Sequence, residues 1–303
     1  MPNSLTLPAS PFTWGQARDL GWRHEGLAEQ IAGGVLERAF RNVYASAGSL
    51  GAMSARAAAL ALVARPDAVF CDRTAAWLHG IDAYSYRELE ILPPADCFVL
   101  SKTRHRVDRA GCRGGERDLR AEDICVVDGL RVTTPLRTAM DLAAVLPRRS
   151  ALAVLDGFMR HHGITTAMLV TMLPRYRGRR GVVQLRALIP VASPLAESPA
   201  ESWTRLEILD DNIPAPEPQH WVEHLGVPLF RLDLAWPKSR VAVEYDGEEW
   251  HDRTPEQRAS DRRRRRWLRD HGWTVIVVRK HQFSGPARDA WLREVRVALG
   301  ITW

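Results

Sequence analysis

Residues 231–247, RLDLAWPKSRVAVEYDG, contain two apolar runs separated by a turn-forming sequence. The runs at 232–236 and 241–243 predict two strands joined by the loop PKSR. Residues directly opposite in an antiparallel pair have Cβ atoms about 4.5–5.5 Å apart. A hairpin centred on the loop therefore predicts two facing carboxylates. Its register pairs 236 with 241, 234 with 243, and Asp233 with Glu244.

Two carboxylates at this separation repel each other, and a divalent cation between them removes the repulsion. Asp246 lies two positions after Glu244, and therefore on the same face of the strand. These three acids predict a site for a divalent cation in which Asp233 and Glu244 are ligands. The alternative is an edge hairpin whose solvent face happens to be acidic, since single carboxylates are common on exposed strands.

Glu201 has two interpretations. The sequence Ser-Pro-Ala-Glu at 198–201 is a capping box with proline at the first helical position, so Glu201 can bond back to the Ser198 amide. A glutamate in the first turn can also face inward and join the metal site. Both interpretations stay open at this point.

An arginine-rich helix is predicted after the hairpin, from Thr254 to about His271, with Gly272 as its end. Trp267 and Leu268 are its expected inward anchors. Five consecutive arginines at 262–266 cover the whole circumference of a helix, so they cannot all serve one ion-pair network. We expect phosphate contacts here; the alternative is a solvated basic face. The candidate contacts in this helix are Arg258, Arg262, Arg263, Arg265, Arg266 and Arg269.

Residues 197–283 resemble the domain family related to the very-short-patch-repair endonucleases, within the PD-(D/E)XK superfamily. The matching stretches are SPAESWTRLEIL, RLDLAWPKSRVAVEYDG with His251, the arginine-rich helix, and RDHGWTVIVVR. The resemblance implies a mixed sheet flanked by helices and a Mg²⁺ site built from the hairpin carboxylates and Glu201. The chain departs from the superfamily pattern at Asp246, where lysine is usual.

The first 50 residues predict a helix, a turn, a second helix and a β-ribbon, which is the plan of a winged helix. This region resembles the N-terminal domain of AbiEi-type antitoxins of type IV toxin–antitoxin systems. The resemblance continues in the middle region, in DRTAAWLHGI and VTTPLRTAMDLA. Arg38 and Arg41 are candidate phosphate contacts. The alternative is a small helical domain that docks on the rest of the chain.

Composition places limits on function. The chain has 303 residues, 42 of them basic, and a net charge of +6, which fits an acidic partner such as DNA. Its four cysteines lack metal-ligand spacing, which favours a reducing cytoplasm. No signal pattern or apolar run long enough to span a bilayer is present, so we expect a cytoplasmic protein without membrane contact.

The predicted class is α/β, as an α+β multidomain chain. The expected domains are a winged helix at 1–50, an AbiEi-like middle domain at 51–190, and a restriction-endonuclease-like mixed sheet flanked by helices at 191–303.

Two functions follow from these features. The first is a Mg²⁺-dependent DNA endonuclease using Glu201, Asp233, Glu244 and Asp246, with His251 positioning the phosphodiester. The alternative is an antitoxin-like autoregulator that binds DNA, with a cognate toxin as possible partner and a catalytically inactive nuclease fold.

Overall fold

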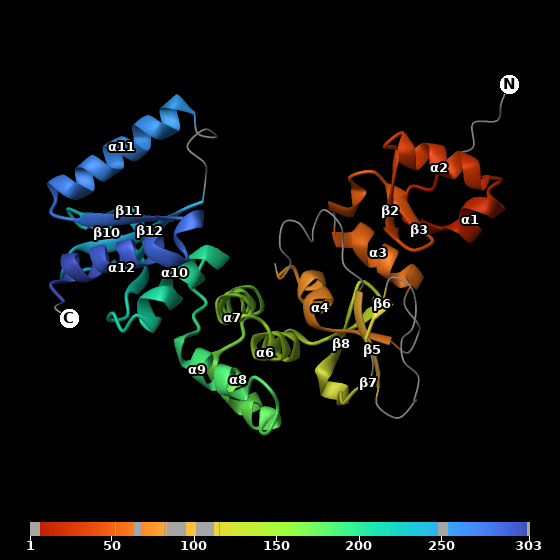
Figure 1. Ribbon diagram of the computed structural model, residues 1–303, viewed down its shortest axis with the longest axis horizontal. Helices are drawn as coiled ribbons and strands as arrows, with labels where there is room; N and C mark the ends of the chain where they lie inside the picture. Colours follow the sequence, from red (N-terminus) through yellow and green to blue (C-terminus); the bar gives the residue numbers. More distant parts are fainter. Residues whose placement is uncertain are drawn as a thin grey trace. The chain divides into compact units, whose positions relative to one another are not determined.

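Figure 1 shows the computed structural model of the chain, which has helices and strands in both halves of the sequence. The structure describes residues 7–51, 53–63, 68–81, 83, 95–100, 112–114, 116–247 and 254–301. Contacts divide the chain into two compact units, Met1–Leu142 and Ala143–Trp303. Both units combine helices with sheet, which confirms the predicted mixed α/β class. The three-domain division stays a prediction.

The first unit begins with two helices and a β-ribbon, in the predicted order. Thr13 caps the first helix by accepting a hydrogen bond from the Gln16 amide, and the Gln16 side chain returns the contact. The sheet order is β1-β3-β2, and Leu27 is buried in the small core against it. The elements are β1 (Phe12–Thr13), α1 (Trp14–Asp19), α2 (His24–Ala32), β2 (Leu36–Phe40) and β3 (Val43–Ser46).

The rest of the first unit is a mixed sheet with helices. The strand order is β6-β5-β4-β9-β8, with β7 paired to β5. Strand β4 is parallel to β9 and antiparallel to β5, so both kinds of pairing occur in one sheet. The elements are η1 (Ser49–Gly51), α3 (Met53–Val63), β4 (Ala68–Phe70), α4 (Asp72–Leu78), β5 (Ala95–Leu100), β6 (Cys112–Arg113), β7 (Glu116–Arg117), η2 (Ala121–Asp123), β8 (Ile124–Val127), β9 (Leu130–Thr133) and α6 (Pro135–Val145).

The second unit opens with helices that hold the start of α10 through one buried acid. Asp156 accepts hydrogen bonds from the Ser193 amide at 2.8 Å, the Ser202 hydroxyl at 2.6 Å and Arg205 at 2.5 Å. Burial raises the pKa of Asp156, and the Arg205 charge opposes that rise. The elements are α7 (Arg148–His162), α8 (Thr166–Met172), η3 (Leu173–Tyr176), α9 (Val182–Leu188), η4 (Ile189–Val191) and α10 (Pro199–Asp210).

A four-stranded sheet with helices on both faces completes the second unit. Its order is β10-β11-β12-β13, and only the β12–β13 pair is parallel within the described strands. Helix α11 covers one face, whereas α10 and α12 lie on the other (Figure 1). The mixed sheet flanked by helices is therefore as predicted. The elements are β10 (Glu217–His224), β11 (Val227–Trp236), β12 (Val241–Asp246), α11 (Pro255–Asp270), β13 (Thr274–Arg279), η5 (Lys280–Gln282) and α12 (Gly285–Leu299).

No helix within the described ranges is both long enough and apolar enough to cross a membrane.

Candidate nucleic-acid interface

Helix α11 carries the arginine run and is anchored to the sheet by its last turns. Proline at position 255 starts the helix without loss of a backbone hydrogen bond, because the first N–H groups of a helix have no partner inside it. Leu268 is fully buried against Leu232 and Val222 of the sheet, and Trp267 packs at the edge of the same core. The two expected inward anchors are thus confirmed, and they fix which side of α11 faces solvent.

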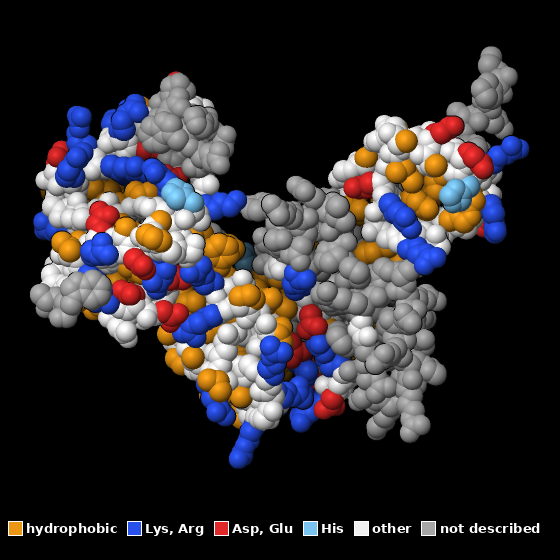
Figure 2. Space-filling view, in the orientation of Figure 1, with side chains coloured by type: hydrophobic (Ala, Val, Ile, Leu, Met, Phe, Trp, Pro, Cys, Tyr) orange, Lys and Arg blue, Asp and Glu red, His pale blue; other side chains and the backbone are white. Residues whose placement is uncertain are grey.

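The arginines of α11 divide into an inward and an outward set. Arg264 donates two hydrogen bonds to Glu244, and Arg265 forms an ion pair with Asp246 at 3.6 Å. The outward set has no ion-pair partner among the described residues, and basic side chains gather over α11 in Figure 2. Three of its members follow the i, i+4, i+7 spacing of one helical face. The exposed members are Arg262, Arg263, Arg266 and Arg269.

The hairpin register is confirmed up to its last predicted pair. Leu234 pairs with Val243, and Trp236 pairs with Val241. The ladder stops there, so Asp233 and Glu244 do not form the third pair. Instead, the Asp233 carboxylate accepts a hydrogen bond from the Tyr245 amide at 3.0 Å.

Asp233 is the site residue with the largest electrostatic perturbation. Burial raises its pKa to about 6, the Tyr245 amide opposes this rise, and the negative charges of Glu201 and Glu244 add to it. The charge of Arg264 lowers the pKa again. The structure therefore brings these acids close enough to interact, which the hairpin pattern predicted for Asp233 and Glu244.

Glu201 forms the contacts of a helix cap. Its carboxylate accepts hydrogen bonds from the Glu197 amide at 2.9 Å and the Ser198 hydroxyl at 3.0 Å. A third donor is the Gln219 side chain, at 2.8 Å. The Ser198 hydroxyl in turn accepts from the Glu201 amide, so this half of the capping box is present, but the Glu201 carboxylate accepts from the Glu197 amide where the Ser198 amide was predicted. Glu201 thus has three donors around its two carboxylate oxygens.

The described carboxylates around the hairpin have separate protein partners. Glu244 and Asp246 lie on the α11 face and are held by Arg264 and Arg265, whereas Glu201 belongs to the helix on the other face. In the described ranges, no group of three or more His, Cys, Asp or Glu residues is arranged to hold a metal ion. Binding of Mg²⁺ by Asp233, Glu244 and Glu201 therefore stays a prediction.

Two other candidates cannot be placed. His251 lies outside the described residues, and the side chain of Arg258 does as well. Their predicted roles in phosphodiester positioning and phosphate contact stay predictions.

The N-terminal candidates lie on the β-ribbon. Arg38 is exposed on β2, and Arg41 is exposed in the turn that follows, where Asn42 adopts a positive φ of 64°. Exposed arginines on a ribbon next to a two-helix unit are suited to phosphate contact, because a guanidinium forms forked hydrogen bonds with phosphate oxygens.

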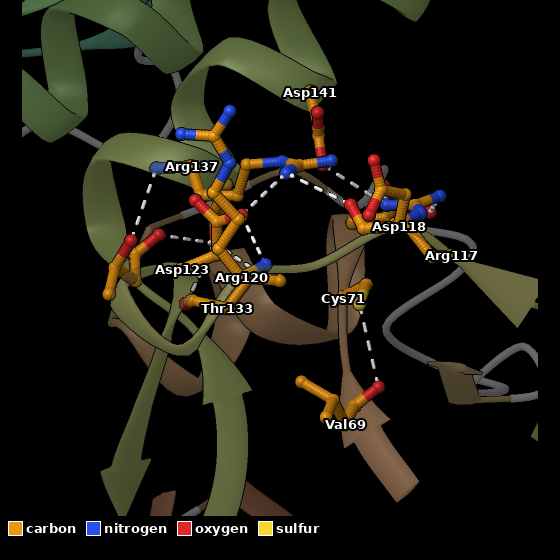
Figure 3. A network of polar contacts seen from close by, with 12 residues as sticks. Val69, Cys71, Arg117, Asp118, Arg120, Asp123, Thr133, Arg137 and Asp141 are labelled. Carbon is orange, nitrogen blue, oxygen red and sulfur yellow. Dashed lines mark hydrogen bonds and ion pairs between the residues drawn. The ribbon is translucent and has the colours of Figure 1, made fainter. Parts of the chain in front are cut away.

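A second charged cluster lies in the first unit (Figure 3). The Arg137 guanidinium, which is 2% exposed, contacts Asp123 at 2.9 Å and Asp141 at 2.8 Å. Arg117 contacts the same Asp141 at 3.2 Å and holds Asp72 in a fork of 2.7 and 2.8 Å. Three acids and two arginines thus alternate through one network, which ties together α4, β7, η2 and α6.

Asp72, at one end of this network, has an uncommon backbone conformation. It begins α4 with a φ of 51°, a conformation that non-glycine residues adopt uncommonly. The Asp72 carboxylate is forked to the Arg117 guanidinium. Burial by itself lowers the pKa of Arg117, but the hydrogen bond and charge of Asp72 raise it above its ordinary value. Burial also raises the pKa of the neighbouring Cys71 thiol, so this cysteine stays protonated.

Sequence reasoning missed two sets of residues. The role of Arg264 has a signal in the sequence, since it lies four positions before Leu268 and therefore on the inward face. The network in the first unit has only a partial signal, the i, i+4 pair of Arg137 and Asp141. Its other members are brought together by the fold from residues 72, 117 and 123.

Comparison with known proteins gives two results. The family model of the AbiEi antitoxin C-terminal domain matches residues 67–191, a range that contains the buried network. An uncharacterized protein of Mycobacterium tuberculosis, found in strain CDC 1551 and in strain H37Rv, is 33% identical over 249 residues. That match covers 82% of this chain and 87% of the mycobacterial protein.

The region expected to be AbiEi-like is thereby supported. The chain belongs to the same family as this mycobacterial protein, and carries within it a match to the AbiEi antitoxin C-terminal domain.

Proposed function

We propose that this protein is an antitoxin-like regulator that binds duplex DNA, including its own promoter. The observation that carries the proposal is the match of residues 67–191 to the AbiEi antitoxin C-terminal domain. Antitoxins that regulate themselves need a DNA-binding surface in the same chain. Two basic surfaces of the described structure supply candidates for it, one on the N-terminal β-ribbon and one on α11.

The N-terminal ribbon supports specific binding. A helix–helix–ribbon unit places one helix in the major groove while the ribbon contacts the neighbouring backbone. Arg38 and Arg41 are exposed on that ribbon. The second helix, α2, offers His24, Glu25 and Glu29 as exposed polar side chains, so its base contacts are limited. Phosphate contacts by the ribbon therefore position the unit on its site.

The outward arginines of α11 support a second, sequence-independent contact. Each phosphate neutralised releases a counterion, so binding weakens linearly on a logarithmic salt scale. Arg262, Arg266 and Arg269 share one helical face and have no acidic partner within the described ranges. A basic stripe of this kind binds the backbone of DNA whatever its sequence.

The first test compares specific and nonspecific binding. We would measure affinity for the duplex upstream of the protein's own gene and for a scrambled duplex of equal composition. In Arg38→Glu/Arg41→Glu, we expect selective loss of the preference for the upstream duplex. Arg293→Glu, on the exposed surface of α12, is the charge-reversal control. Equal affinity of the wild-type protein for both duplexes would remove the regulator proposal.

A cognate toxin is the proposed protein partner. Co-expression of this chain with a toxin encoded beside it should restore growth that the toxin alone arrests. Restoration that persists in Arg38→Glu/Arg41→Glu would assign neutralisation to surfaces other than the DNA-binding ribbon. Failure of the wild-type protein to restore growth would remove the partner assignment and leave DNA binding to be judged separately.

The second candidate function is metal-dependent DNA cleavage. One observation favours it, since the confirmed hairpin register brings Asp233 and Glu244 to one end of the ladder. Asp233, Glu244 and Glu201 would hold Mg²⁺ or Mn²⁺, with Asp246 and His251 nearby in the sequence. The ion would lower the pKa of an attacking water and stabilise negative charge on the phosphate. The contacts of Arg264 and of Glu201 weigh against this arrangement.

Cleavage is tested directly. Supercoiled, linear, mismatched and single-stranded DNA would be incubated with the wild-type protein and Glu244→Ala, each with Mg²⁺ or Mn²⁺. Cutting that requires metal and disappears in the variant would establish the nuclease. Absence of cutting on every substrate, with duplex binding retained, would leave the regulator as the function.

A further inference from the structure

Arg264 contacts both carboxylate oxygens of Glu244. One terminal nitrogen, Nη1, donates to Oε2 of Glu244 at 2.9 Å, and the other, Nη2, donates to Oε1. Nη2 also donates to the carbonyl oxygen of Arg231 at 2.8 Å. A forked guanidinium–carboxylate pair is among the strongest side-chain contacts in proteins, and arginine does not lose its proton. Both Glu244 oxygens are therefore engaged by a permanent positive charge.

The Glu244–Arg264 pair is only partly exposed to water, which strengthens its charge interactions. The Glu244 side chain is 10% exposed and that of Arg264 27%, so water screens the pair only in part. Asp233 lies close enough for its carboxylate to interact with both partners, repelled by Glu244 and stabilised by Arg264. The guanidinium that is forked to Glu244 thus also acts on Asp233, although burial has the larger effect on that carboxyl.

We propose that Arg264 is the resident cation of this carboxylate cluster, taking the place at Glu244 that a divalent metal ion would need. The C-terminal sheet then keeps its fold and its acidic residues without a metal. A metal ion requires carboxylate oxygens that are free to coordinate it. Here Glu244 is forked to Arg264, and Glu201 has three donors of its own. The inference goes beyond the regulator function and depends on neither DNA nor a toxin.

A consequence concerns the arginine run. Arg264 cannot leave Glu244 for a DNA phosphate without leaving a largely buried carboxylate unpaired, and that costs free energy. DNA binding by α11 is therefore assigned to its outward arginines. The inward arginines, Arg264 and Arg265, hold the helix on the sheet, and neighbouring positions of one run have separate roles.

The experiment uses the full chain and Mn²⁺ as the probe. Binding of Mn²⁺ would be followed by electron paramagnetic resonance, and thermal unfolding would be recorded with Mn²⁺ and with a chelator. The wild-type protein and the surface control Arg293→Met should show the same unfolding temperature under both conditions. Arg264→Met should unfold at a lower temperature in chelator and recover several degrees in Mn²⁺, because a ligand that binds only the folded state stabilises it.

A second variant links the response to Glu244. In Arg264→Met/Glu244→Gln, the Mn²⁺ response of Arg264→Met should disappear, and the unfolding temperature in chelator should rise relative to Arg264→Met. If Arg264→Met does not fold, folding of the double variant supports the proposal, because the unpaired charge has been removed. A double variant that also fails to fold would overturn it.

Two further results would overturn the proposal. The first is Mn²⁺ binding by the wild-type protein that is lost in Glu244→Gln, because Glu244 would then be available to a metal with Arg264 present. The second is a folded Arg264→Met protein with unchanged stability and no Mn²⁺ response. Neither result depends on DNA binding, so failure of this inference and failure of the regulator function remain distinguishable.

Discussion

The two units each contain a cluster of largely buried charges, and the clusters are neutralised in different ways. In the first unit, Arg117 and Arg137 contact acids from several separate segments, and no single element provides the whole network. In the second unit, the cation for Glu244 comes from α11, the same helix that carries the exposed Arg262, Arg263, Arg266 and Arg269.

This difference separates a structural cluster from one that adjoins a binding surface. Segments far apart in sequence are fixed by the first network, so its loss should affect folding. In α11, some arginines hold the helix on the sheet, whereas adjacent ones face the DNA that is proposed to bind there. Changes in that helix should therefore affect stability or DNA binding according to the direction of the side chain.

The largest expected effect is in the first network. Arg137→Met leaves Asp123 and Asp141 without their main cation, and breaking a buried ion pair from one side costs about 3–5 kcal/mol. We expect the unfolding transition of the first unit to move to lower urea concentration by a corresponding amount. Arg120→Met is the control, since Arg120 is 61% exposed and its pair with Glu122 is worth about 1 kcal/mol or less. Equal losses in both variants would contradict a structural role for the network.

The next effect concerns Asp233, whose carboxylate interacts with the same Arg264 guanidinium as Glu244 does. The pKa of Asp233 is raised to about 6 in the folded protein, above the ordinary value of 3.8. Folding therefore favours the protonated form, and stability from this group is present below about pH 4 and is lost as pH rises through 6. Asp233→Asn should stabilise the protein at pH 8 by about 1–3 kcal/mol.

At pH 4 the same substitution should change stability little, because the wild-type carboxyl is protonated in the folded state. Urea unfolding at both pH values measures the difference. An equal effect of Asp233→Asn at pH 4 and pH 8 would contradict the raised pKa. Glu223→Gln, an exposed acid on β10, is the control for general changes of charge.

A smaller effect distinguishes the geometry of the cation from its charge. Arg264→Lys keeps the positive charge but cannot form the fork to Glu244 or reach the Arg231 carbonyl at the same time. We expect a loss of about 1–2 kcal/mol in chemical unfolding. Arg266→Lys, on the exposed face, should be nearly neutral. If the two lysine variants are equally stable, the inward Arg264 contributes no more to stability than the exposed Arg266, which would contradict the proposed difference between them.

Much of the second unit could be predicted from sequence because its signals are local. The four-residue loop and the apolar runs beside it fix the hairpin register, and Ser198 with Glu201 marks the start of α10. Trp267 and Leu268 identify the inward side of α11. These features depend on residues a few positions apart, where the periodicities of helix and strand determine direction.

What the sequence could not provide depends on long-range contacts. The hairpin pattern predicts Asp233 opposite Glu244, but the ladder ends one pair earlier, and the Asp233 carboxylate accepts the Tyr245 amide there. Asp72 and Asp123 meet arginines 45 and 14 positions away, and no local pattern marks them. In each case the partner of a charged side chain is decided by the tertiary fold.

The smallest expected effect, on DNA affinity, addresses the outward face of α11. Removing one phosphate contact should weaken binding to any duplex by about threefold and reduce the slope of log affinity against log salt by about one unit. We expect this for Arg266→Gln, measured by fluorescence anisotropy over a range of salt concentrations. Arg293→Gln, on the exposed surface of α12, should keep the wild-type slope because α12 covers the opposite face of the sheet.

Arg266→Gln should also leave the unfolding temperature unchanged, since its side chain has no partner within the described ranges. Arg264→Lys should do the reverse, lowering stability while keeping the salt slope, because Arg264 already neutralises Glu244 and contacts no phosphate. A salt slope that falls in Arg264→Lys as much as in Arg266→Gln would mean that α11 rearranges on DNA and releases Glu244. In that case the cluster of the second unit would be part of the DNA-binding surface itself, unlike the structural network of the first.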